Sequence, residues 1–309
     1  MTGIQFLFVI LTSLLLGLLI HKWFIKLQKF DAINFRSVHQ TKATKTGGIA
    51  VFLTLFFFST YFYFCSIQIY DYSMLIPLGI MFVVGVYDDF YNANFKLKFF
   101  LQIIVAKILI DQGFIIDHFH GVMGLEEIPR LAAQLFTIFV FLVIVNAINF
   151  MDGIDGLAIT ETIKLILLVE FFSLQPTPIY LLGMICIFAM LPLYYFNYKK
   201  DYKVFLGDAG SLFLGTLIAA YLFYVLGSEY ILKPIYLINK PLFTISLIIY
   251  PLVDLLRVFI IRIRNKKSPF SPDQNHLHHL LVKKGYSHSL IVIIIQSISL
   301  MFLLFSFLI

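Results

Sequence analysis

Four polar residues interrupt a long apolar run in the segment NAINFMDGIDGLA, which covers residues 146–158. They are spaced three apart: Asn146, Asn149, Asp152 and Asp155. At about 100° per residue, positions three apart drift by roughly 60° per step, so the first and last would end on opposite sides of one straight helix. Gly153 and Gly156 allow the chain to break there. We therefore predict a helix end near Gly153, with Asp155 capping the next helix.

Three further aspartates lie in two short motifs, VYDDF with Asp88 and Asp89, and FLGDAGS with Asp208. Glycines on both sides of Asp208 permit a tight entry into a helix that begins there. A helix N-terminus offers N–H groups that bind phosphate, but a carboxylate at that place repels phosphate unless a cation lies between them. Carboxylates combined with phosphate oxygens are typical Mg²⁺ ligands. The pattern favours magnesium-assisted chemistry on a phosphate compound.

A histidine motif, SPFSPDQNHLHH, occupies residues 268–279. Its prolines exclude a helix up to Pro272, and Asp273 or Asn275 can cap the helix that follows. His276 and His279, three apart, then share a face. Zinc is the less favoured interpretation, because no cysteine or HExxH motif lies nearby. Histidines beside basic residues suit a diphosphate better, since their charge is adjustable near neutral pH.

The composition requires that these motifs sit in a membrane protein. Hydrophobic residues make up 60% of the 309 residues and charged residues only 13%, against about 25% charged in soluble domains. The net charge of +6 is interpreted as a membrane-orientation signal and not as a nucleic-acid footprint. Cys65 and Cys186 lie in apolar runs, so no disulfide framework is expected.

We predict an all-α, polytopic integral membrane protein with about ten transmembrane helices. The candidate spans are 4–25, 48–67, 73–88, 97–112, 131–149, 156–174, 178–196, 209–227, 236–258 and 290–309. Eighteen of the 23 Lys and Arg residues fall in the odd-numbered connections, which are therefore cytoplasmic, with both termini outside. The five aspartates Asp88, Asp89, Asp152, Asp155 and Asp208 then lie at the cytoplasmic face. A transporter would place such carboxylates near the bilayer midplane, often within repeats, and no repeat is evident.

With these motifs the chain resembles the bacterial polyprenyl-phosphate N-acetylhexosamine-1-phosphate transferases, the glycosyltransferase 4 family. Its members include the initiating enzymes of teichoic acid, enterobacterial common antigen and O-antigen synthesis. The resemblance covers the whole chain, through DAINFRSVHQTKATKTGGIA, DDFYNANFKLKFFLQ, NAINFMDGIDGLA, FLGDAGSLFLG and SPFSPDQNHLHHLL in that order. The phospho-MurNAc-pentapeptide translocase is a related alternative, but the histidine motif is similar to the sugar-1-phosphate transferase branch.

The resemblance implies a single transmembrane transferase domain over residues 1–309 in the bacterial cytoplasmic (inner) membrane. Such an enzyme transfers a sugar-1-phosphate, such as N-acetylglucosamine 1-phosphate, from a UDP-sugar to undecaprenyl phosphate and releases UMP. This is the initiating step of cell-envelope polysaccharide synthesis. The implied cofactor is Mg²⁺, with Mn²⁺ as a substitute. The implied partners are the UDP-sugar, undecaprenyl phosphate and membrane lipid. A homodimer is compatible with the resemblance, and nucleic acid is not an expected partner. Which amino sugar and which polysaccharide are left open.

The resemblance also implies roles for individual residues. Asp208 corresponds to the metal ligand, and the pair Asp88 and Asp89 to the catalytic acidic pair near the lipid phosphate. The implied substrate-binding residues are Asn149, Asp152, Asp155, Phe205, His276, His278, His279, Lys45 and Lys98. Lys96 is the alternative to Lys98 for the basic position in its motif. The first connection departs from the family in lacking prolines between His39 and Gly47, and Asn197 is offset by one residue. Direct attack by the lipid phosphate and a two-step route through an aspartyl-phosphate both stay open.

Overall fold

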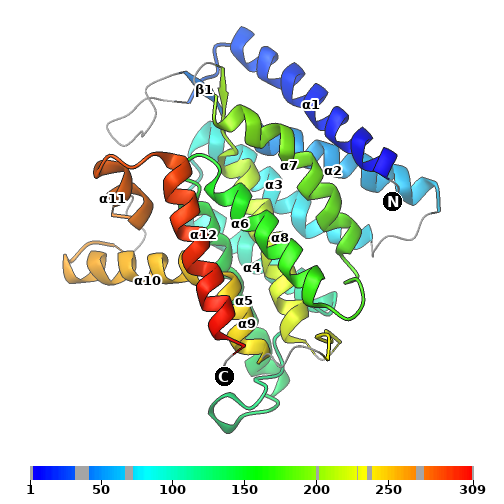
Figure 1. Cartoon of the computed structure of the whole chain (residues 1–309), viewed down its shortest axis with the longest axis vertical. Coiled ribbons are helices and arrows are strands. Elements are labelled where there is room, and N and C mark those ends of the chain that lie inside the picture. Colours follow the sequence, from blue (N-terminus) through cyan, green and yellow to red (C-terminus); the bar gives the residue numbers. More distant parts are fainter. Residues whose placement is uncertain are drawn as a thin grey trace.

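The computed structural model describes residues 3–31, 42–66, 72–199, 202–227, 229–234, 239–268 and 275–307. Helices dominate these residues (Figure 1). The first six are α1 (Gly3–Lys26), α2 (Gly47–Phe64), α3 (Leu75–Tyr91), α4 (Phe95–Asp111), α5 (Arg130–Met151) and α6 (Leu157–Phe172). They are followed by α7 (Tyr180–Asn197), α8 (Gly207–Leu226), α9 (Lys240–Leu247), α10 (Ile249–Arg264), α11 (Leu277–Lys283) and α12 (His288–Phe305). Two short strands, β1 (Ala43–Thr44) and β2 (Lys203–Val204), pair in parallel.

Helix α8 is the centre of the bundle and packs against α2, α3, α5, α6 and α9. Two glycines bring its neighbours to its first turn. A Cβ on Gly85 of α3 would lie 2.2 Å from the carbonyl oxygen of Asp208, and a Cβ on Gly48 of α2 would lie 2.2 Å from the backbone nitrogen of Gly210. These helices therefore pack backbone against backbone, which places the end of α3 beside the start of α8.

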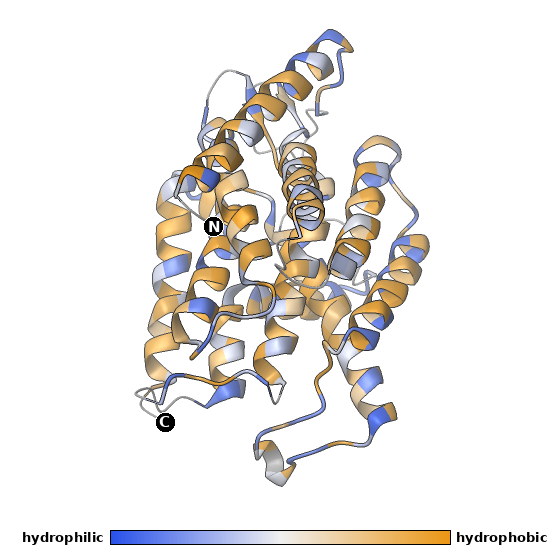
Figure 2. Cartoon of the chain, turned by 90° about the vertical axis from the view of Figure 1, so that its right-hand side faces the viewer, coloured by the Kyte–Doolittle hydropathy of each residue, from blue (hydrophilic) through white to orange (hydrophobic). Residues whose placement is uncertain are grey.

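The helices are mostly hydrophobic, while hydrophilic residues are frequent at helix ends and in the connections (Figure 2). Among the described residues, seven helices are long and apolar enough to cross a membrane, or up to eight if the bent pair α9 and α10 is one span. The chain is thus an all-α membrane protein, as predicted. Each of the ten predicted spans overlaps a helix, but α4 and α6 have only 17 and 16 residues, so the number ten stays a prediction.

The predicted span 236–258 is not one straight helix. Helices α9 and α10 meet at Ile248 with a bend of 71°. Pro251 explains the break, since it has no N–H to donate to the carbonyl of Leu247 four residues earlier. The bend turns α10 away from α9 (Figure 1).

The predicted break in NAINFMDGIDGLA is confirmed, because α5 ends at Met151 and α6 begins at Leu157. The expected cap is wrong. The N-cap of α6 is Gly156, with φ of +75° and no side-chain hydrogen bond. A left-handed glycine at this place lets the backbone turn into the helix, so Asp155 points elsewhere.

Candidate active site

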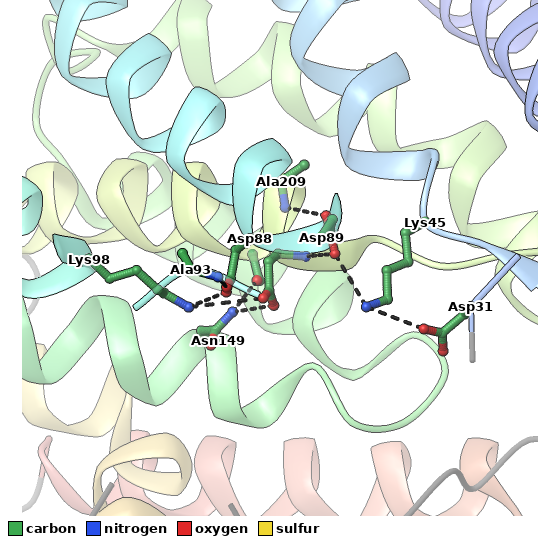
Figure 3. A network of polar contacts seen from close by, with 10 residues as sticks. Asp31, Lys45, Asp88, Asp89, Ala93, Lys98, Asn149 and Ala209 are labelled. Carbon is green, nitrogen blue, oxygen red and sulfur yellow. Dashed lines mark hydrogen bonds and ion pairs between the residues drawn. The ribbon is translucent and has the colours of Figure 1, made fainter. Parts of the chain in front are cut away.

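The first turn of α8 carries Asp208, as the sequence predicts. Around it gather the last turn of α3, with Asp88 and Asp89, the last turn of α5, with Asn149, and two lysines (Figure 3). The segments are far apart in the chain, but the close packing of α3 on α8 brings them together at one end of the bundle.

Asp89 caps helix α8 from outside. Its Oδ1 accepts the N–H of Asp208 at 3.1 Å, and its Oδ2 accepts the N–H of Ala209 at 2.9 Å. The carboxylate, only 6% exposed, satisfies N–H groups that have no partner within their own helix. Gly207, with φ of +72°, makes room for it, since a Cβ there would lie 2.8 Å from Asp89 Oδ2.

Asp88 faces the opposite side of the α3 terminus. It accepts the backbone N–H of Ala93 at 2.7 Å through Oδ1 and forms an ion pair with Lys98 through Oδ2. The same Lys98 Nζ lies 3.9 Å from Asp208 Oδ2, so Lys98 bridges the two carboxylates. Its rival Lys96 is exposed and contributes its backbone N–H to the cap of α4.

Asn149 orients the carboxylate of Asp208. Its Nδ2 donates to Asp208 Oδ1 and to Ser211 Oγ, both at 2.8 Å. The other oxygen of Asp208 faces Lys98, and the side chain is 34% exposed. One oxygen is therefore held by Asn149, and the other lies within ion-pair distance of Lys98.

Lys45 approaches Asp89 from the other side (Figure 3), at 3.5 Å, and also pairs with Asp31 at 3.2 Å. Burial alone would lower the pKa of this lysine, but Asp89 and Asp31 outweigh burial and raise the pKa above its ordinary value. The parallel ladder of β1 and β2 holds Lys45 there, and it continues as a 2.9 Å hydrogen bond from Gly47 N–H to the carbonyl of Phe205. The half-buried ring of Phe205 lies under the ammonium of Lys203.

Asp152 follows α5 and faces the same centre. Burial, followed by the negative charges of Asp208 and Asp89, raises its pKa well above the ordinary value. Among the described residues, the four aspartates Asp88, Asp89, Asp152 and Asp208 outnumber the two lysines that face them, Lys45 and Lys98, so part of the negative charge is uncompensated. That excess fits a divalent cation.

No group of three or more His, Cys, Asp or Glu side chains suited to a metal occurs within the described part of the chain. Such a group is not needed for Mg²⁺, which one or two carboxylates and the oxygens of a phosphate substrate commonly hold. Asp208, with one oxygen oriented by Asn149 and its side chain partly exposed, fits this mode.

The three predicted histidines gather at the start of α11. His276 Nδ1 lies 2.8 Å from Asp254 Oδ2, and His278 Nδ1 lies 2.9 Å from the hydroxyl of Tyr250. The cluster packs on Gly153, where a Cβ would lie 2.6 Å from His278 Nε2. This contact joins the histidine motif to the break after α5. His278 is fully buried, and burial followed by the charge of His279 holds its pKa well below the ordinary range.

Asp155 is turned away from Asp208. Its Oδ2 contacts Lys203 Nζ and His288 Nδ1, each at 2.6 Å. Its neighbour Gly156 donates to Asn197 Oδ1 at 2.6 Å, and Asn197 Nδ2 donates to the carbonyl of Val204 at 2.9 Å. Asp155 and Asn197 therefore tie the start of α6 to β2 and α12.

Three of these partners escaped sequence reasoning: Asp254, Lys203 and His288. Lys203 counted only as a basic residue of a connection. Asp254 had a usable signal, because a carboxylate within an apolar span is costly and by default suggests a function or a buried partner.

A comparison with known protein families points to the same residues. The sequence profile of the family described as glycosyl transferase family 4 matches residues 72–226, which include Asp88, Asp89, Asn149 and Asp208. The chain is 29% identical to the "Probable undecaprenyl-phosphate N-acetylglucosaminyl 1-phosphate transferase" of Bacillus subtilis (strain 168), over 97% of this chain and 82% of the relative.

Two further relatives are 29% identical as well. The "Decaprenyl-phosphate N-acetylglucosaminephosphotransferase" of Mycobacterium tuberculosis (strain CDC 1551 / Oshkosh) is covered over 84% of this chain and 70% of its own length. The alignment with the "Undecaprenyl-phosphate alpha-N-acetylglucosaminyl 1-phosphate transferase" of Salmonella typhi covers 85% of this chain and 71% of the relative.

Proposed function

The chain belongs to glycosyl transferase family 4, and we propose that it transfers N-acetylglucosamine 1-phosphate, or a close amino-sugar relative, from a UDP-sugar to undecaprenyl phosphate, with release of UMP. The convergence of Asp88, Lys98 and Asn149 on Asp208 is the observation that carries this proposal. The relatives named as N-acetylglucosaminyl 1-phosphate transferases support the sugar and the polyprenyl acceptor. They favour this branch over the pentapeptide translocase and over a transporter.

The reaction brings two anions together, so charge neutralisation and positioning are its main requirements. Lys98 and Lys45 flank the two sides of the carboxylate centre and supply positive charge to the phosphates. Asp208, oriented by Asn149, and Asp152 would hold Mg²⁺. When bound, the cation would neutralise phosphate charge and polarise the phosphorus–oxygen bond that breaks as UMP leaves. Asp89 keeps Asp208 in place through the N–H groups of Asp208 and Ala209, the second and third residues of α8.

We infer direct attack of the lipid phosphate oxygen on the sugar-side phosphorus. Both oxygens of Asp89 accept backbone N–H groups, and both oxygens of Asp88 are occupied by Ala93 and Lys98. Carboxylates held in this way are poor nucleophiles for an aspartyl-phosphate route. Asp88 and Asp89 stay the two candidates to accept a proton, although a phosphate monoester with a second pKa of about 6 is already mostly ionised. Retention of configuration at a chiral thiophosphorus centre would overturn direct attack.

The remaining features of the proposal concern the setting of the reaction. With ten spans, the concentration of lysine and arginine in the odd-numbered connections supports both termini outside and an active site on the cytoplasmic face of a bacterial inner membrane. The donor nucleotide would lie over Phe205 and Asp152, and the histidine cluster would serve its sugar and diphosphate side. A homodimer belongs to the same proposal.

Purified protein in detergent, incubated with undecaprenyl phosphate, Mg²⁺ and a panel of UDP-sugars, tests the proposal. The panel includes the GlcNAc, GalNAc, QuiNAc and FucNAc donors. We expect UMP release that requires both the lipid phosphate and the cation, with UDP-GlcNAc among the accepted donors. Absence of UMP with every donor would overturn the proposed function.

A further inference from the structure

Asp254 is a buried carboxylate within α10, and two of its three hydrogen bonds to described residues are made with the histidine motif. It is 3% exposed. Its Oδ2 contacts His276 Nδ1 at 2.8 Å, and its Oδ1 accepts the N–H of Leu277 at 2.8 Å and an N–H of Arg257 at 3.0 Å. A charge at such a site is costly unless it is fully paired, and here every partner belongs to α10 or to the start of α11.

These contacts fix the residues at the entry to α11. Leu277 is the first residue of the helix, so the Asp254 carboxylate satisfies an N–H that has no partner within α11. Arg257, one turn along α10, also donates to the carbonyl of Asn275. Two side chains of α10 thus hold both sides of His276, and its backbone and ring are fixed together.

The carboxylate also decides which nitrogen of His276 carries the hydrogen. An ionised carboxylate only accepts hydrogen bonds, so the hydrogen lies on Nδ1, and Nε2 is the nitrogen that can meet a substrate. An amide at position 254 would reverse this. Its oxygen must stay towards the N–H of Leu277 and Arg257, which turns its NH₂ group towards His276 and forces Nδ1 to accept.

From this geometry we infer that Asp254 is a positioning residue for the transfer reaction, acting through the tautomer and orientation of His276. The inference rests on the proposed function, in which His276 serves the sugar and diphosphate side of the donor. Its structural part, the control of the His276 tautomer, stands independently of any activity. A carboxylate that orients a functional histidine is a general device, and its replacement by an amide supplies the wrong tautomer.

Two readouts test the inference on the full-length protein in detergent. The first is nitrogen NMR of ¹⁵N-histidine-labelled protein at pH 8 without substrate, with the His276 signals assigned by comparison with His276→Gln. We expect hydrogen on Nδ1 in the wild type and on Nε2 in Asp254→Asn. An unchanged tautomer in Asp254→Asn would overturn the inference even if the variant is inactive.

The second readout is a double-mutant cycle on UMP release. Asp254→Asn should lower kcat by about tenfold or more, with a smaller change in KM, and adding His276→Gln should cause little further loss because both changes act through one group. Full multiplication of the two losses would overturn the inference. Asp254→Glu, which keeps the charge, should recover part of the activity.

A matched control is available in the connection between α4 and α5. Asp117 pairs with His118 Nδ1 at the similar distance of 2.9 Å, but it is 44% exposed. Asp117→Asn should leave kcat unchanged, whereas an equal loss in both variants would show that the effect is not specific to His276. Lack of UMP release by the wild type would reject the proposed function and leave the NMR result to decide the role of Asp254.

Discussion

Asp89 accepts the backbone N–H groups of Asp208 and Ala209, which lie in the first turn of α8. The acidic pair at the end of α3 is therefore divided between two tasks. Asp89 holds the start of α8, while Asp88 shares Lys98 with Asp208. Adjacent aspartates that look equivalent in the sequence have different surroundings in the fold, so their substitutions should differ.

Replacement of Asp89 should affect both folding and activity. Asp89→Ala removes the cap of α8 and leaves Lys45 with less opposing charge, at a cost of about 1–2 kcal/mol in the free energy of unfolding. Activity should also fall, because Asp208 loses its fixed position. Thermal unfolding in detergent and UMP release measure the two effects. Asp111→Ala, at an exposed carboxylate that pairs with Lys107 on α4, should change neither, and equal behaviour of the two variants would contradict the capping role.

Asp208→Asn should separate metal binding from folding. The amide oxygen can still accept from Asn149, so the unfolding temperature should stay close to that of the wild type. The negative charge next to Lys98 is lost, however, and activity at saturating donor should fall by about 10²–10³-fold, with a higher Mg²⁺ requirement for what is left. UMP release measured against Mg²⁺ concentration checks this prediction. Full activity in Asp208→Asn would exclude Asp208 as the metal ligand.

The sequence predicted the parts of the site that depend on local rules. Glycines around residues 153–156 predicted the break between α5 and α6, and a Gly-Asp pair predicted the start of α8, both of which the structure has. Both signals depend on backbone preferences that operate within a few residues. The same holds for the apolar runs that became helices.

Pairings across the bundle could not be predicted in the same way. Asp155 was expected to cap α6, yet it contacts Lys203 and His288, 48 and 133 residues further along the chain. Asp254 was absorbed into an apolar span, and the bend of that span at Ile248 was missed although Pro251 is a local signal for it. These contacts depend on which helix faces meet, and no periodicity in a single segment carries that information.

Two glycines of α3 provide a test of the close packing that builds the site. A Cβ at Gly85 would lie 2.2 Å from the backbone of Asp208, whereas a Cβ at Gly79 would meet only the ring of Phe52 at 3.7 Å. Gly85→Ala should therefore force α3 and α8 apart, lower the free energy of unfolding by about 1–3 kcal/mol and reduce UMP release. Gly79→Ala should be neutral or stabilising by up to about 1 kcal/mol, because alanine favours helix. Similar effects at both positions would contradict the packing of α3 on α8.

The buried His278 should make stability dependent on pH in a defined direction. Its pKa is held well below the ordinary value by burial and by His279, whereas in the unfolded chain it titrates at about 6.5. Below that pH the unfolded state binds the proton more readily, so folding stability is fully present above about pH 6.5 and falls as the pH decreases. Thermal unfolding between pH 7.5 and 5 should show this loss, and His278→Gln should reduce the slope. His118→Gln, at a partly exposed histidine in the connection between α4 and α5, should keep the wild-type slope. If His278→Gln keeps the wild-type dependence of stability on pH, the buried ring of His278 does not cause it. The interpretation of His278 as a neutral ring that is hydrogen-bonded to Tyr250 would then be wrong.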